Sequence, residues 1–304
     1  MPPRTSAEAL LFSTGVLNVD KAAGETSFAV VSRLRRVTRA NRVGHAGTLD
    51  PLATGVLPIL FESATRLAEF ALRLPKTYVA DIHFGYNTAT DDAEADREPV
   101  GDPSTLTEET VREGLEVFSG RILQEPPAFS AVKVGGKRAY KLARGGSTER
   151  PSAREVEVYE ALLLAFQPGP DAVARVEIRC GSGTYMRSIA RDLGAKLGVG
   201  GYLGRLIRTA YGSLTIGSAI PSAELVTVEQ IRDRLLPAEV ILPEMELVRL
   251  TVEQEAAVRQ GRSVRVLPEP GPGLIRAHDH GGRLVALGHT DPLRRTFVPE
   301  KVLS

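Results

Sequence analysis

The chain has 304 residues, of which 42% are hydrophobic and 25% charged, with a formal net charge of +1. This composition is that of a globular protein with one large or two ordinary domains, and it excludes collagen-like, coiled-coil and disordered chains. Its longest apolar runs, such as residues 161–166, are far shorter than a bilayer span, so no membrane segment is expected.

Apolar periodicity predicts the elements of the first part of the chain. Residues 15–20 alternate as a strand, and the turn and Ser/Thr residues after them predict a helix cap before a helix at 28–37. A buried strand at 57–61, a short helix at 64–72 and an alternating strand at 77–85 follow.

The middle of the chain predicts a helix and a strand pair around a basic segment. Residues 107–118 form an amphipathic pattern capped by Thr107. Residues 124–146, with two prolines and two glycine pairs, predict a long basic loop containing a short helix. Strands at 154–166 and 172–180 come next, before a helix at 188–197.

After residue 250 the sequence becomes rich in proline and glycine. It predicts a helix at 252–260 and short strands at 274–278 and 284–288. We therefore expect a boundary near residues 243–250, followed by a small, mostly β module.

Charge is segregated along the chain although the net charge is small. Acidic residues gather at 91–98 and 108–116, and arginines gather at 33–42. Residues 121–154 are locally basic and carry Arg121, Lys133, Lys137, Arg138, Lys141, Arg144, Arg150 and Arg154 against Glu125 and Glu149. This pattern fits a polyanion-binding face, and it fits equally well a solvated helix face beside a mobile loop.

The stretch RVGHAGTLDPLATGVLPIL places Asp50 between glycines and a run of aliphatic residues. A carboxylate there can be a nucleophile, a general base, a metal ligand or the cap of a turn. The five histidines do not cluster with acids or with Cys180 at ligand spacing, so no metal site is expected. Glycosidase chemistry would need a second carboxylate, and none adjoins Asp50, although a distant one could fold into place.

Other candidate residues give weak signals when taken singly. Tyr185 and Arg187 follow two glycines at a predicted strand-to-helix junction, where a ring can stack on a base and a guanidinium can pair with a carboxylate. Taken alone, Tyr185 and Tyr78, the latter on its alternating strand, are better explained by simple packing. Further candidates whose roles the spacing leaves open are Lys21, His45, Leu206 and Arg208.

Four segments, in this order, resemble the motifs of the bacterial TruB-type tRNA pseudouridine-55 synthases. They are residues 15–27, 44–55 (GHAGTLDPLATG), 126–144 and 183–189. The resemblance runs from about residue 15 to residue 212. The tail resembles a PUA RNA-binding domain, mainly through residues 274–279 and 297–302.

This resemblance implies an isomerisation of uridine, with Asp50 as a nucleophile toward either the pyrimidine ring or the anomeric carbon of a flipped nucleotide. It further implies that Tyr78 stacks on the uracil and assists proton removal, and that Arg187 pairs with Asp50. Lys21 would support the site, and His45 would fill the place that the flipped bases vacate. The substrate-binding residues expected in all are Lys21, His45, Tyr185, Leu206, Arg208, Lys133, Lys137 and Arg138.

The sequence departs from the family pattern at three positions. Ala22 stands where proline is usual, which loosens a turn without touching the chemistry. Ile207 replaces an arginine and Tyr202 replaces a histidine, so one RNA contact is expected to be missing or moved.

We therefore predict an α+β fold with a central mixed, largely antiparallel sheet in a catalytic domain at 11–245. The domain would carry an RNA-binding insertion at about 124–154, and a PUA-like module would follow at 248–304. The expected partner is the T-arm stem-loop of tRNA, gripped by the insertion and by residues 33–42. The rival hypotheses are an RNA-folding chaperone of the same fold, a synthase acting on another RNA and a metal-dependent nuclease.

The lone Cys180 excludes an internal disulfide, and the first 15 residues lack the basic-then-apolar plan of a secretion signal. We accordingly expect a cytoplasmic monomer that needs no cofactor, no metal and no obligate protein partner.

Overall fold

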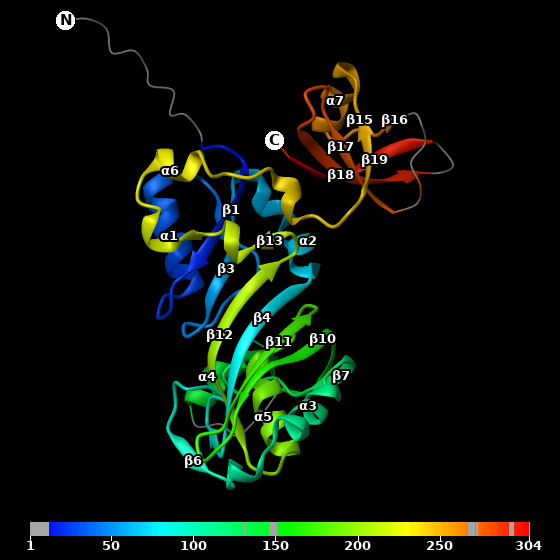
Figure 1. Ribbon diagram of the computed structural model, residues 1–304. Coiled ribbons are helices and arrows are strands. Elements are labelled where there is room, and N and C mark those ends of the chain that lie inside the picture. The colour runs from blue at the N-terminus through cyan, green and yellow to red at the C-terminus, as the bar shows by residue number, and fades with distance from the viewer. Residues whose placement is uncertain are drawn as a thin grey trace, which may run out of the picture.

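The computed structural model describes residues 12–130, 132–145, 151–266, 271, 273–291 and 295–303. An elongated α/β body carries a separate, smaller sheet beside one end (Figure 1). This arrangement confirms the predicted fold class.

The body is built on one large sheet, which has ten strands among the described residues. Their order is β14-β1-β3-β12-β4-β11-β10-β7, with β2 beside β3 and β13 beside β12. Two pairs, β1 with β14 and β3 with β12, are parallel and the others antiparallel, as predicted. The strands are β1 (Gly15–Lys21), β2 (Val43–His45), β3 (Thr54–Phe61), β4 (Lys76–Phe84), β7 (Gly120–Gln124), β10 (Arg154–Gln167), β11 (Val173–Cys180), β12 (Gly201–Tyr211), β13 (Leu214–Thr215) and β14 (Ile220–Pro221).

The helices of the body are mostly where the periodicity predicts them. They are α1 (Ser27–Thr38), α2 (Ala68–Arg73), α3 (Glu108–Glu116), α5 (Met186–Lys196) and α6 (Val228–Arg232). No helix in the described part of the chain is both long and apolar enough to cross a membrane.

The single helix predicted at 64–72 is wrong in its first turn, which is a 3-10 helix, η1 (Glu62–Leu67). Thr65 donates its hydroxyl to the Glu62 carbonyl at 2.7 Å, and such a bond to the backbone competes with regular α-helical pairing. Other short 3-10 turns are η2 (Pro103–Thr105), η3 (Ile216–Ser218), η4 (Ser222–Glu224) and η5 (Ala238–Ile241).

The sequence pattern did not predict β12, which lies at the centre of the sheet between β3 and β4. Two arginines, Arg205 and Arg208, interrupt its apolar alternation. Arg208 is nevertheless only 1% exposed, because its charge is met by backbone carbonyls inside the body. The buried Arg208 therefore made the sequence of this core strand look like that of a polar segment.

Strand alternation divides the apolar residues of the sheet between two cores. In β1, Leu17 joins the core beneath α1, α3 and α5, whereas Val16 joins the core on the opposite face. In β3, Leu57 and Leu60 separate in the same way. Successive side chains of a strand point to opposite faces, so the two cores lie on opposite faces of the sheet. On β10 and β11 the residues that alternate with the core residues are exposed or half-buried.

The insertion contains a hairpin of β8 (Lys133–Val134) and β9 (Lys137–Arg138), followed by α4 (Ala139–Arg144). The short helix confirms the prediction, and the hairpin was not foreseen. Gly135 and Gly136 connect its strands with φ of 55° and 83°, which a two-residue type I′ turn requires. A second small pair, β5 (Tyr86–Thr88) and β6 (Arg97–Pro99), lies before α3.

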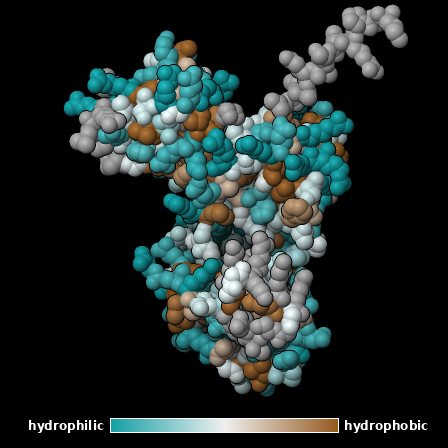
Figure 2. Space-filling model, turned by 180° about the vertical axis from the view of Figure 1, so that it is seen from behind, coloured by the Kyte–Doolittle hydropathy of each residue, from teal (hydrophilic) through white to brown (hydrophobic). Residues whose placement is uncertain are grey.

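The smaller sheet has the order β15-β17-β18-β19-β16 and is accompanied by α7 (Val252–Arg259). Its strands are β15 (Glu246–Arg249), β16 (Val264–Arg265), β17 (Leu274–His278), β18 (Leu284–Asp291) and β19 (Thr296–Val302). Leu287 and Leu303 join the second core of the body, and Lys301 pairs with Glu69 at 2.7 Å. The module thus projects sideways but is packed onto the body, and the face seen in Figure 2 is mostly hydrophilic with small groups of hydrophobic residues.

A glycine substitution tests the packing of α5 on β12. A Cβ at Gly194 would lie 2.2 Å from backbone atoms of Gly200 and Gly201. Alanine usually favours a helix by about 1 kcal/mol over glycine. We nevertheless expect Gly194→Ala to lower the free energy of unfolding by about 2 kcal/mol, because the backbone beside it must shift. Urea denaturation would measure this difference.

The matched control is Gly217→Ala, since a Cβ at Gly217 meets no atom within 4 Å. It should change stability by less than about 0.5 kcal/mol. Equal effects of the two substitutions would contradict this packing.

Candidate active site

A cavity of about 560 Å³ lies where β4, β12 and the start of α5 meet. Its lining includes six of the predicted residues, which come from four separate stretches of the sequence, namely Asp50, Tyr78, Tyr185 with Arg187, and Leu206 with Arg208. The fold thus brings six of the eleven predicted site residues to one place.

Four segments present these side chains. Tyr78 on β4 and Arg208 on β12 are cross-strand partners, so their side chains share one face of the sheet. Arg187 lies in the first turn of α5, shortly after Tyr185, which is the N-cap residue. Asp50 belongs to the turn that precedes β3, where the Ala53 amide donates to the Asp50 carbonyl.

Arg187 is shared between two carboxylates. Its Nη2 lies 2.9 Å from Oδ2 of Asp50, and its Nη1 lies 3.6 Å from Oδ2 of Asp92. The guanidinium also donates to the carbonyls of Thr90 and Phe129, each at 3.2 Å. Four acceptors on three segments therefore fix a side chain that is only 6% exposed.

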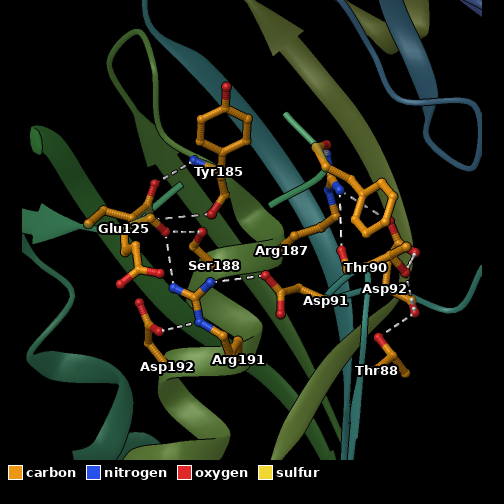
Figure 3. Close-up of polar contacts among 12 residues, drawn as sticks. Thr88, Thr90, Asp91, Asp92, Glu125, Tyr185, Arg187, Ser188, Arg191 and Asp192 are labelled. Carbon is orange, nitrogen blue, oxygen red and sulfur yellow. Dashed lines mark hydrogen bonds and ion pairs between the residues drawn. The ribbon is translucent and has the colours of Figure 1, made fainter. Parts of the chain in front are cut away.

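The two carboxylates differ in access to solvent. The Asp50 side chain is 37% exposed, whereas that of Asp92 is 3% exposed. Asp92 accepts from the Thr90 hydroxyl at 2.5 Å (Figure 3). It also accepts from the Glu94 amide at 3.0 Å. Only Asp50 is presented to the cavity, and a carboxylate held in this way can act as a nucleophile or a general base.

Lys21 lies beneath the Asp50 turn and does not line the cavity. Its fully buried ammonium donates to the carbonyls of Ala22, Glu25 and Pro51 at 2.8, 2.7 and 3.3 Å. Burial lowers the pKa of Lys21. Lys21 thus ties the turn after β1 to the residue that follows Asp50.

A second buried cation forms the floor of the cavity. Arg208 donates to the carbonyls of Val56 at 2.6 Å and Gly47 at 3.1 Å, and it lies 5.1 Å from the centre of the Tyr211 ring. Burial raises the pKa of the nearby Tyr78 phenol, although the charge of Arg208 acts in the opposite direction. Tyr78 is therefore protonated at neutral pH in the free protein.

Lys76 also lines the cavity, at the end formed by Leu72 and Ser182. It donates to the Leu72 carbonyl and to the Ser182 hydroxyl. Burial, followed by the charge of Arg208, lowers the pKa of Lys76 to about 8. This residue was missed in the sequence, yet it stands two positions before Tyr78 on an alternating strand, which places both on one face.

Two further lining or supporting residues were also missed. Phe129 lines the cavity from the start of the insertion. Asp92 belongs to the acidic run at 91–98, which gave no sign that one of its members pairs with Arg187. The sequence left open whether a distant carboxylate folds into place near Asp50. That carboxylate is Asp92, which pairs with the same Arg187 guanidinium as Asp50.

The remaining predicted residues lie elsewhere. His45 is half-buried on β2 and does not line the cavity, and burial together with Arg208 lowers its pKa, so its imidazole is neutral at pH 7. Lys133, Lys137 and Arg138 belong to the insertion hairpin, and their side chains lie outside the described residues.

The three residues at which the sequence departs from the family pattern, Ala22, Tyr202 and Ile207, do not line the cavity. Tyr202 is buried at the start of β12, where it stacks on His83 with ring centroids 5.2 Å apart. Ile207 points to the opposite face of the sheet from Leu206 and Arg208, next to Val79. Ala22 lies in the turn held by Lys21. Within the described ranges, no group of three or more His, Cys, Asp or Glu residues could hold a metal ion.

Comparison with known proteins agrees with this geometry. The family model described as the TruB family pseudouridylate synthase, N terminal domain, matches residues 35–186. The chain belongs to the TruB family. A relative from Synechococcus elongatus, named tRNA pseudouridine synthase B, is 44% identical over 91% of this chain and 94% of its own length. A relative of the same name from Thermobifida fusca is 42% identical over 90% of this chain and 93% of its own.

Solved structures extend the likeness over the whole TruB-family chain. A chain of a Cbf5-Nop10-Gar1 complex superposes with a TM-score of 0.70 at 27% identity, over 95% of this chain and 85% of that one. A chain of an archaeal box H/ACA sRNP Nop10-Cbf5 complex gives 0.71 at 25% identity, over 100% and 90%. The family match ends at residue 186, so Arg187 and the β12 residues complete the cavity from beyond it.

The shared guanidinium predicts a specific pattern of stability. Arg187→Gln leaves Asp92 buried without its partner, so we expect the free energy of unfolding to fall by about 3–5 kcal/mol. Adding Asp92→Asn should recover part of this loss, because the stranded charge is removed. Urea denaturation of the single and double variants would measure both effects.

Asp50→Asn serves as the comparison, and it should cost about 1 kcal/mol or less because Asp50 is partly solvated. A double variant as unstable as Arg187→Gln alone would refute the shared pairing.

Proposed function

We propose that this TruB-family protein is a tRNA pseudouridine synthase that isomerises uridine 55 in the T arm, with Asp50 as the nucleophile. The observation that carries the proposal is the partly exposed Asp50 carboxylate held 2.9 Å from the buried Arg187 in a cavity lined by three tyrosines. The names of the relatives, tRNA pseudouridine synthase B, support tRNA as the substrate.

The reaction requires the uridine to leave the base stack, since its glycosidic bond is otherwise out of reach. Extrusion costs a few kcal/mol. The cavity offers aromatic rings on which a base can stack and the apolar side chains of Leu206 and Phe129. His45, outside the cavity wall, is proposed to fill the place that the flipped bases leave.

Substrate and product are isomers, so no water or redox partner is consumed. Asp50 forms a bond to the pyrimidine ring or to the anomeric carbon, and the bond from N1 to the sugar breaks. The base rotates, C5 bonds to the anomeric carbon, and Asp50 is released. The proton lost from C5 is balanced by the proton that N1 gains.

The neighbouring side chains divide the remaining tasks. Arg187 orients Asp50, and Lys21 supports the turn that carries it. Tyr78 stacks on the uracil as a neutral phenol, because burial raises its pKa. Proton removal by Tyr78 would depend on Arg208, whose charge lowers that pKa.

RNA contacts outside the cavity are assigned to basic segments. We propose that residues 11–245 form the catalytic domain, that its insertion at 124–154 and the arginines at 33–42 grip the T-arm stem-loop, and that residues 248–304 form a PUA-like RNA-binding domain. Phosphate contacts by lysine and arginine supply affinity through counterion release.

Asp50→Asn distinguishes an enzyme from an RNA-folding chaperone of the same fold. We expect pseudouridine formation in a T-arm transcript to be abolished, because an amide is not a nucleophile of the required kind, while RNA binding stays measurable. Mass spectrometry of the transcript and a filter-binding titration would show this. The matched control is Asp171→Asn, which makes the same carboxylate-to-amide change at an exposed residue in the turn after β10. This variant should retain full activity.

Retained activity in Asp50→Asn would rule out the nucleophilic role. Activity that disappears with a chelator and returns with added metal would instead favour a metal-dependent enzyme.

The basic insertion predicts salt-dependent binding. Changing Lys133, Lys137 and Arg138 to glutamate should weaken T-arm binding and reduce the slope of log affinity against log salt by about one for each phosphate that the protein no longer neutralises. Thermal melting should change little, because lysine and arginine side chains are rarely part of a hydrophobic core. Affinity that ignores both salt and these substitutions would show that the insertion does not grip the RNA.

A further inference from the structure

The insertion begins and ends on two residues that both contact Tyr185. Gln124 is the last residue of β7 and Arg154 the first of β10, and the two are cross-strand partners. This single pair closes the base of the insertion. Tyr185, the residue it contacts, lines the cavity that holds Asp50.

Gln124 holds the backbone of Tyr185. Its side chain is only 1% exposed, and its Oε1 accepts from the Tyr185 amide at 2.8 Å. Its Nε2 donates to the Tyr185 carbonyl at 3.2 Å. This two-bond exchange is the one that paired residues make in an antiparallel sheet, so a side-chain amide extends β7 onto the start of α5.

The start of α5 depends on this contact. Tyr185 is the N-cap residue, and its own side chain makes no capping hydrogen bond. The first backbone N–H groups of a helix have no acceptor within the helix, so a group from outside it, such as a neighbouring side chain, accepts from them. Gln124 does so directly before Arg187.

Arg154 holds the ring of Tyr185. Its guanidinium carbon lies 5.2 Å from the centre of the ring, and its Nη2 donates to the Gly183 carbonyl at 2.9 Å. A cation over an aromatic face is attracted by the ring, so this contact favours the orientation that the ring has here. The cavity wall is thus braced by the residue where the insertion ends.

The next residues of the insertion are also joined to α5 (Figure 3). The Glu125 carbonyl accepts from the Ser188 hydroxyl at 2.7 Å and from Arg191 at 3.0 Å. Arg191 is fixed in turn by Asp91 and Asp192 at 2.9 and 2.8 Å. Since Arg187 also bonds to the Phe129 carbonyl, the start of the insertion is hydrogen-bonded to the first two turns of α5.

We infer that Gln124 and Arg154 are positioning residues that couple the hold of the insertion on RNA to the placement of Tyr185 and Arg187 in the cavity. The inference rests on the proposed function. Neither residue lines the cavity, so both act through Tyr185. Substituting them should therefore affect the rate of pseudouridine formation in the protein–RNA complex more than the affinity with which that complex forms.

The first test is the single-turnover rate of pseudouridine formation with saturating T-arm stem-loop. Gln124→Glu keeps the size of the side chain and the acceptor for the Tyr185 amide, but it replaces the donor to the Tyr185 carbonyl with a carboxylate oxygen. We expect the rate to fall about tenfold, the effect of removing one buried hydrogen bond. The dissociation constant for the stem-loop should change less than the rate.

Leu123→Ser is the matched control, because Leu123 is the neighbouring residue on β7 and is 74% exposed. It should keep the wild-type rate. A Gln124→Glu rate equal to that of the control, or a loss of affinity as large as the loss of rate, would overturn the inference. Wild-type protein that makes no pseudouridine would instead refute the proposed function.

A double-mutant cycle separates positioning from a general structural role. Arg154→Ala should slow the reaction about fivefold, in line with the removal of one cation–π interaction. In a Tyr185→Ala background the same change should add little, because the ring it holds is gone. Equal effects in both backgrounds would overturn the inference, and this cycle remains available if Gln124→Glu does not fold.

Discussion

The site depends on one buried guanidinium shared between two carboxylates. Arg187 can serve both Asp50 and Asp92 because its planar fork offers several donors in fixed directions, which a lysine cannot. A buried ion pair is favourable only when its other polar groups are also satisfied. The carbonyls of Thr90 and Phe129 meet that condition for the two terminal nitrogens of Arg187, while its buried Nε has no hydrogen-bond partner among the described residues and one carboxylate stays open to the cavity.

The rest of the architecture serves to bring these groups together. The turn before β3 carries Asp50, the loop after β5 carries Asp92, and α5 carries Arg187. Each of these segments is held by a hydrogen bond on the side away from the cavity. Lys21 bonds to the Asp50 turn, the Thr90 hydroxyl bonds to Asp92, and Gln124 bonds to the start of α5. The large sheet supplies the common frame, because its central strands β4 and β12 carry Tyr78, Leu206 and Arg208.

Much of the fold could be predicted from local patterns. The strands β1 and β4 and the helix α3 follow from alternation, helical periodicity and a Thr107 cap. The residue types of the site followed from motifs, since Asp50, Tyr78 and Arg187 stand in segments of recognisable sequence. Sequence patterns failed to predict the structure where a charged residue is buried. The buried Arg208 kept the central strand β12 from being predicted, and the buried Lys76 was not predicted to line the cavity.

The pairing of Asp92 with Arg187 could not be predicted for a different reason. It joins residues far apart in the chain, and nothing in the acidic run at 91–98 separates the member that is buried from those that are solvated. The same holds for Gln124, an ordinary polar residue whose contact with the backbone of Tyr185 exists only after β7 and α5 have met. Such roles are created by tertiary structure.

The most direct test of the account is the single-turnover rate of Arg187→Lys on a saturating T-arm stem-loop. Lysine keeps the charge but cannot bond to Asp50, Asp92 and both carbonyls at once. We predict that the rate falls by about 100-fold or more, equivalent to roughly 2.7 kcal/mol, in a variant that still folds and binds RNA. A rate near that of the wild type would contradict the claim that this shared guanidinium sets the position of the reactive carboxylate.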